Sequence, residues 1–194
     1  MADKETTGLN LDCGTCTACC RELIIDVPGL TKHAGVLCTN CISAKGCAIY
    51  GDRPQGCRDF LCGWRQLPLS EEWRPDRCEI IVMQEPDDRE AGVLGGWKFF
   101  LFGGLDKIFW RPFILFVSSL IAADKIVYIS ILGAPGEHSR MMAITPEPEL
   151  KHAVTMSNYA TVVGIMAALI QSCLDTPGDP VIFQQSPSVL IPAA

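Results

Sequence analysis

Positive charge and histidine are scarce in this sequence of 194 residues. Lys and Arg number 16 against 22 Asp and Glu, three histidines are present, and the formal net charge is −6. A protein that binds phosphate backbones presents a basic surface. We therefore expect no nucleic-acid partner.

Long apolar runs are also missing. Asp106, Arg111 and Asp124 divide the apolar region 99–132 into pieces, of which the longest is PFILFVSSLIAA. A spanning helix needs about 20 apolar residues, so we interpret the region as core and expect no membrane span. The N-terminus MADKETTGLNLD is acidic and lacks the apolar stretch of a secretory signal, which favours a cytoplasmic protein.

Sequence motifs of the common catalytic sites are absent as well. The chain contains no G-x-S-x-G, P-loop, G-x-G-x-x-G or H-E-x-x-H pattern. This favours a binding protein over an enzyme.

Cysteine, in contrast, is abundant. Ten of the 11 cysteines lie within the first 78 residues, and Cys173 stands alone in an apolar segment, where we expect a buried thiol. In a reducing compartment, C-x-x-C pairs are typical of metal or redox ligands rather than structural disulfides.

The first cysteines form the motif C-G-T-C-T-A-C-C, residues 13–20. Gly14 and Thr15 are poor helix formers, so we predict a knuckle with amides directed at sulfur, followed by a helix at about 18–23. Successive helical residues turn by about 100°. Cys19 and Cys20 therefore point in different directions, and one ion cannot readily take both.

The downstream cysteines supply the remaining ligands. We predict nine metal-ligating residues: Cys13, Cys16, Cys19, Cys20, Cys38, Cys41, Cys47, Cys57 and Cys62. Structural zinc takes four ligands in a tetrahedron, so this set fills either two closed sites or a cluster with bridging sulfurs, with Cys19 and Cys20 between the metals. Nearby arginines would offset the thiolate charge by donating to sulfur, namely Arg21, Arg53, Arg58 and Arg65.

The sequence resembles the bacterial CxxCxxCC, or YkgJ-like, family of zinc- or iron-chelating domains. The resemblance rests on the motif at 13–20, on Cys38, and on CAIYGDRPQGCRDFLC at 47–62, with WRPDR at 73–77 also similar. It implies eight metal ligands: Cys13, Cys16, Cys19, Cys20, Cys38, Cys47, Cys57 and Cys62. Cys41 and Cys78 are extra to the family pattern, and their roles stay open.

Three functions are compatible with these features. The first is chelation of two or more zinc or iron ions, mainly for structure or for interaction with an unidentified protein partner. The second is a redox or electron-transfer protein, because Cys13, Cys16 and Cys19 with Cys57 or Cys62 have the spacing of a [4Fe–4S] site. The third is a protein methylase, since such enzymes contain a related cluster, although no glycine-rich donor loop is present.

The fold prediction is α+β. We expect a loop-rich cysteine module at 1–79, a compact α+β part packed on it at 80–185, and a tail at 186–194. Runs of β-branched and other apolar residues bounded by turn formers predict strands at 78–84, 97–102, 125–132 and 139–145. Helices are predicted at 111–124 and at 149–175, the second broken near Ser157 and Asn158.

Overall fold

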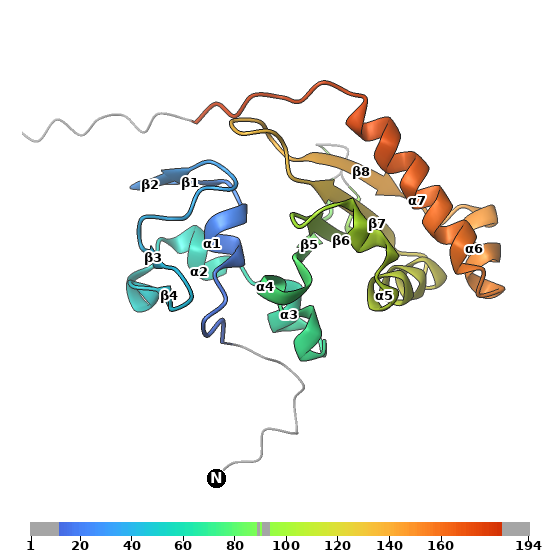
Figure 1. Ribbon diagram of the computed structural model, residues 1–194, viewed down its shortest axis with the longest axis horizontal. Helices are drawn as coiled ribbons and strands as arrows, with labels where there is room; N and C mark the ends of the chain where they lie inside the picture. Colours follow the sequence, from blue (N-terminus) through green and yellow to red (C-terminus); the bar gives the residue numbers. More distant parts are fainter. Residues whose placement is uncertain (1–11, 89, 91–93, 184–194) are drawn as a thin grey trace, which may run out of the picture.

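The computed structural model of the chain describes residues 12–88, 90 and 94–183 (Figure 1). Its helices and strands are, in chain order, α1 (Ala18–Glu22), β1 (Ile25–Val27), β2 (Leu30–Lys32), β3 (Cys41–Ile42), β4 (Gly46–Cys47), η1 (Tyr50–Asp52), α2 (Gln55–Asp59), α3 (Gly63–Gln66), η2 (Glu71–Trp73), α4 (Pro75–Cys78), β5 (Ile80–Glu85), β6 (Gly96–Leu101), η3 (Leu105–Phe109), α5 (Arg111–Ala122), β7 (Ile126–Ile131), β8 (Arg140–Ile144), α6 (Pro148–Thr155) and α7 (Tyr159–Leu174).

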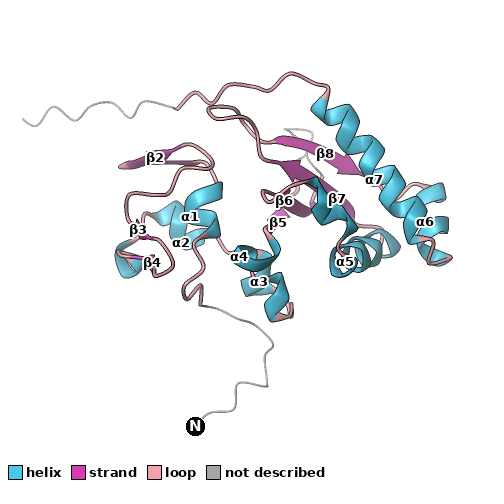
Figure 2. Ribbon diagram, viewed as in Figure 1, coloured by secondary structure: helices cyan, strands magenta, loops and turns pink. Residues whose placement is uncertain are grey.

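A four-stranded sheet with the order β5-β6-β7-β8 forms the centre of the molecule (Figure 2). The β5–β6 and β7–β8 pairs are antiparallel, whereas β6 and β7 run parallel. The segment that joins the parallel pair contains η3 and α5, the kind of helical crossover that parallel neighbours require. The predicted α+β class, with a largely antiparallel sheet and a C-terminal helix, is confirmed.

The two faces of this sheet have different partners, because neighbouring residues of a strand point to opposite faces. Ile80, Val82 and Phe99 belong to the main core under the helices. Ile81 and Phe100 belong to a second cluster, which includes Ala18 of α1. The sheet therefore lies between the cysteine-rich segments on one side and α5, α6 and α7 on the other (Figure 1).

The short helices before β5 join the main core. Trp64, Trp73 and Cys78 are each less than 10 % exposed and pack in the same cluster as β5 and β6. Residues 63–78 thus connect the cysteine-rich segments to the sheet. The predicted boundary at residue 79 stays a prediction, and the predicted tail at 186–194 lies outside the described residues.

The predicted break in the last helix is confirmed. Ser157 has a φ of 53°, a left-handed conformation that ends α6. The Asn158 side chain then accepts a hydrogen bond from the amide of Thr161 at 3.3 Å, which caps the start of α7.

After α7 the chain returns to the cysteine-rich side. Val181 donates to the carbonyl of Gly136 at 2.8 Å, between β7 and β8. Phe183 then packs against His33, with ring centroids 4.6 Å apart. In the described part of the chain, no helix has the length and apolarity to cross a bilayer.

Candidate metal centre

The opening loop, residues 12–17, turns sharply before α1 begins. The amide of Cys16 donates to the carbonyl of Cys13 at 3.0 Å, and the Asp12 carboxylate accepts from the amide of Gly14 at 2.9 Å. Gly14 has a φ of 53°, which glycine adopts without the steric cost of a side chain. The predicted knuckle and the helix that follows it are both present.

This loop packs directly on the β3–β4 hairpin. A Cβ on Gly46 would lie 2.8 Å from the carbonyl oxygen of Gly14. Glycine at position 46 therefore allows the opening loop to lie against β4, the strand that carries Cys47.

The sulfur of Cys16 accepts hydrogen bonds from two segments that are far apart in the sequence. The amides of Ala18 and Asp76 and the guanidinium of Arg74 hydrogen-bond to it. Burial has the larger effect and raises the pKa of the Cys16 thiol. Amide and guanidinium donors of this kind are the contacts that stabilise a thiolate.

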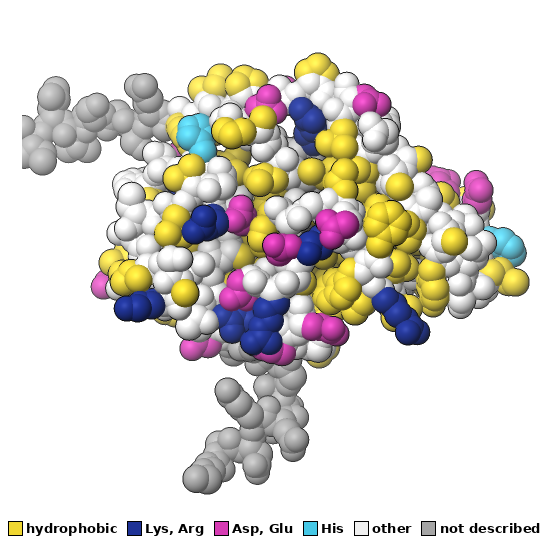
Figure 3. All heavy atoms as spheres, viewed as in Figure 1, with side chains coloured by type: hydrophobic (Ala, Val, Ile, Leu, Met, Phe, Trp, Pro, Cys, Tyr) yellow, Lys and Arg dark blue, Asp and Glu magenta, His cyan; other side chains and the backbone are white. Residues whose placement is uncertain are grey.

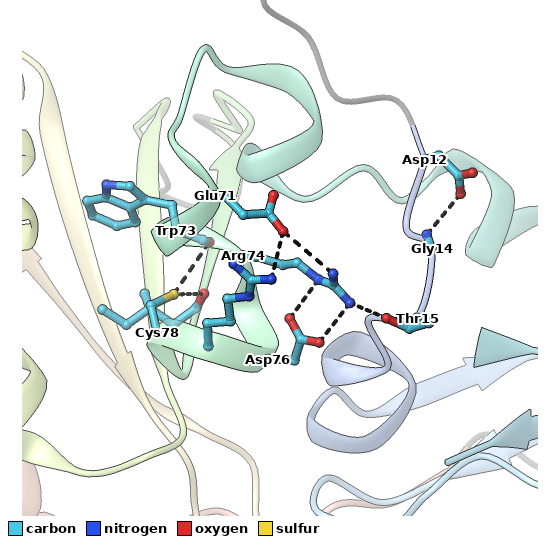
Figure 4. A network of polar contacts seen from close by, with 10 residues as sticks. Asp12, Gly14, Thr15, Glu71, Trp73, Arg74, Asp76 and Cys78 are labelled. Carbon is cyan, nitrogen blue, oxygen red and sulfur yellow. Dashed lines mark hydrogen bonds and ion pairs between the residues drawn. The ribbon is translucent and has the colours of Figure 1, made fainter. Parts of the chain in front are cut away.

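Arg74 fastens the start of α4 to the opening loop (Figure 4). Its Nη2 donates to Thr15 Oγ1 at 2.5 Å and to Asp76 Oδ2 at 2.9 Å, and its Nε lies 2.8 Å from Asp76 Oδ1. A weaker ion pair of 3.6 Å joins Arg74 to Glu71. Sequence reasoning noted WRPDR only as part of the resemblance and assigned Arg74 no role.

The first cysteine group consists of Cys13, Cys16, Cys19 and Cys62. All four line one small cavity, which Trp64 and Ile81 help to enclose. Burial is the main cause that raises the pKa of Cys62, and the charges of Cys13 and Cys16 add to it. This group lies against the sheet, because Cys16, Cys19 and Cys62 pack on the cluster of Ile81 and Phe100.

The second cysteine group consists of Cys20, Cys38, Cys41, Cys47 and Cys57. The amide of Cys38 donates to the carbonyl of Cys20 at 2.9 Å, and Cys41 and Cys47 are paired across β3 and β4. Burial is the largest cause that raises the pKa of Cys57, and the neighbouring Cys20 and Cys38 add to it. All members except Cys41 line a cavity of about 330 Å³, onto which Cys13, Cys16 and Cys19 also open.

Hydrogen bonds between thiols connect the two groups. The side chain of Cys20 is hydrogen-bonded to those of Cys19 and Cys41. The bond to Cys19 is the largest cause that raises the pKa of Cys20, whereas burial is the largest cause that raises the pKa of Cys41 to about 11. Cys19 and Cys20 thus lie where the groups meet.

The donor set suits a soft metal ion, although ligation requires the thiols to rearrange. As they stand, the described residues include no group of three or more His, Cys, Asp or Glu that could hold a metal ion. The pKa values of Cys16, Cys41, Cys57 and Cys62 are all raised, so these thiols are protonated near neutral pH. A metal that binds here must displace protons and draw the sulfurs together.

Two further cysteines lie outside both groups. The sulfur of Cys78 lies 3.4 Å from the carbonyl oxygens of Trp73 and Ile80, inside the main core. Cys173 is only partly buried on α7, so the expectation of a buried thiol there is wrong.

Basic side chains near the thiols only partly match the prediction. Arg53 and Arg65 act electrostatically on Cys57 and Cys62, whereas the guanidinium of Arg58 bonds to Gln55 at 2.8 Å. Lys32, which carried no sequence signal, is buried beside the second group.

Comparison with protein-family models gives no match, and neither curated proteins nor solved structures give a significant one.

Proposed function

We propose that this chain is a metal-binding protein that chelates two or more zinc or iron ions through its cysteines. The observation that carries the proposal is the division of the nine predicted ligands into two neighbouring groups. Cys13, Cys16, Cys19 and Cys62 share one small cavity. Cys20, Cys38, Cys47 and Cys57 line a larger one, onto which the first three also open. Each is a set of four thiols, the number that a closed tetrahedral zinc site takes.

The adjacent pair Cys19 and Cys20 supports more than one metal. The two residues are consecutive on α1, yet each belongs to a different group. Cys41, the fifth member of the second group, is hydrogen-bonded to Cys20. It would bridge two ions or remain outside the coordination shell.

A closed shell of four thiolates leaves no open position for water or substrate, so the role that we propose is structural or one of partner interaction. The partner would be a protein, because the net charge of −6 does not suit nucleic acid.

An iron–sulfur centre is the second candidate, and one observation favours it. The sequence left either Cys57 or Cys62 as the remote fourth ligand after Cys13, Cys16 and Cys19. Cys62 is the only other cysteine in the small cavity that Cys13, Cys16 and Cys19 line, whereas Cys57 shares with them the larger cavity that also contains Cys20, Cys38 and Cys47. The four cysteines of the small cavity have the composition of a [4Fe–4S] site.

The test is metal and sulfide analysis of protein purified without oxygen or chelator. Colourless protein with about two zinc ions per chain, one for each set of four thiols, supports the zinc reading. Brown protein with acid-labile sulfide supports the iron–sulfur reading. Protein without bound metal would refute both.

Serine variants then test the two groups. We expect Cys62→Ser to empty the first group and Cys57→Ser to weaken the second, so that the residual ions differ in affinity and in cobalt spectrum. Cys173→Ser, on α7, serves as the matched control and should bind as the wild type does. Identical losses from Cys62→Ser and Cys57→Ser would contradict the division into groups.

A further inference from the structure

Lys32, the last residue of β2, is a buried cation next to the second cysteine group. Lys32 is 7 % exposed. Lysine is almost never buried to this extent without a partner for its charge. The surroundings of its ammonium group therefore need an explanation.

The ammonium group is held by three backbone carbonyls. Its Nζ donates to the carbonyl of Arg21 at 3.0 Å, to that of His33 at 2.9 Å, and to that of Leu23. Three acceptors satisfy all three N–H donors of an ammonium. The hydrogen bonds are complete, but every acceptor is neutral, so the positive charge itself is not compensated by them.

Thiols lie close to the ammonium group of Lys32. Burial has the largest effect on that group and lowers its pKa, whereas Cys38 and Cys20, followed by Glu22, act in the opposite direction. The carbonyls of Arg21 and Leu23 also lie at the end of α1, the helix that carries Cys19 and Cys20. One side chain thus holds the end of that helix and brings a positive charge toward the second group.

We propose that Lys32 is a positioning residue that balances the negative charge of the metal-loaded second cysteine group. This inference rests on the proposed function. A divalent ion held by four thiolates forms a centre of charge about −2. A fixed cation beside that centre stabilises the metal-loaded state more than the metal-free state.

The experiment measures the affinity of metal-free, reduced protein for zinc or cobalt by competition with a chromophoric chelator. Lys32→Met removes the charge and keeps most of the volume, and we expect the affinity of one set of sites to fall by about 10–100-fold, the size of effects from groups just outside a coordination shell. Lys32→Arg keeps the charge and should recover most of that loss. Lys151→Met is the control, because it removes the same charge from α6, where Lys151 pairs with Asp124.

Thermal unfolding of the metal-free variants separates the effect of the Lys32 charge on metal affinity from any effect of the substitution on folding. If Lys32 acted only by holding the carbonyls, Lys32→Met would lower stability and affinity together, whereas Lys32→Gln, which keeps N–H donors, would retain the wild-type affinity, and the proposal would be wrong. Should Lys32→Met not fold, Lys32→Gln keeps amide donors for the carbonyls without the charge, and the same loss of affinity is expected. Wild-type affinity in the neutral variants would overturn the role of Lys32, whereas a wild type that binds no metal would overturn the proposed function and this role with it.

Discussion

Replacing Arg74 by alanine tests whether the opening cysteine loop is held by the segment before the sheet. The Arg74 side chain is 15 % exposed. Its contacts join residues far apart in the sequence, since Thr15 precedes α1 and Asp76 lies in α4. Loss of this side chain should therefore release the loop and weaken the folded state together.

The expected magnitude follows from the bonds that are lost. The bond to Thr15 joins a charged and a neutral group, but it is exposed, so it contributes about 0.5–1.5 kcal/mol. The two-point pair with Asp76 adds about 0–1 kcal/mol, because the Asp76 side chain is 33 % exposed. Together these terms predict that Arg74→Ala lowers the free energy of unfolding by about 1–2.5 kcal/mol.

Urea denaturation of the metal-free, reduced protein is the appropriate assay, because it excludes changes in metal occupancy. The midpoint should fall at an unchanged slope. Arg77→Ala is the matched control: the Arg77 side chain is 55 % exposed and forms an ion pair of 3.2 Å with Glu71, so its loss should cost about 0–1 kcal/mol.

A double-mutant cycle with Thr15→Ala isolates the contact between the loop and α4. The coupling should be about 0.5–1.5 kcal/mol in favour of the native pair. If Arg74→Ala is no more damaging than Arg77→Ala, or if the cycle gives no coupling, the assignment of Arg74 as the link is refuted.

Two further predictions concern the main core. Trp73→Ala should lower the free energy of unfolding by about 3–5 kcal/mol in the same assay. Trp73 is 5 % exposed and packs against Trp110, with ring centroids 4.7 Å apart. A loss below about 1 kcal/mol would contradict this packing. Cys78→Ala should leave the metal content unchanged, and it should also alter the dependence of stability on pH. Burial raises the Cys78 pKa from 9.0 to about 12. The contribution of the neutral thiol to the free energy of unfolding is therefore fully present below pH 9 and is lost as the pH rises toward 12. Wild-type protein should lose about 1.4 kcal/mol per pH unit relative to Cys78→Ala over that range, and parallel stability profiles would rule this out.

The strands of the sheet were predictable because their patterns are local. Apolar residues bounded by glycine and proline predicted strands at 97–102 and 125–132, and β6 (Gly96–Leu101) and β7 (Ile126–Ile131) match to within one residue. The parallel pairing of β6 with β7 was not predictable in this way. It depends on where the crossover through α5 brings the chain back, which no local pattern encodes.

The cysteine site was likewise predictable only where its sequence signals are local. Spacing predicted nine thiol ligands, which stay a prediction, and the helical turn between Cys19 and Cys20 predicted that these two side chains would face different partners. Whether Cys57 or Cys62 completes the first group depends on how α2 and α3 fold back on the sheet, and sequence reasoning left both possible. The charge partners were missed for a related reason, since Arg74 and Lys32 reach the thiols only through long-range packing.

The two cysteine groups differ in what holds them before any metal binds. The first lies against Ile81 and Phe100 of the sheet and is tied to α4 through Arg74. The second is carried largely by β3, β4 and the loops beside them, and each of these strands has two residues. Isolated hairpins of that length are marginal in water, so the metal would supply much of the order of the second group and the sheet much of the order of the first.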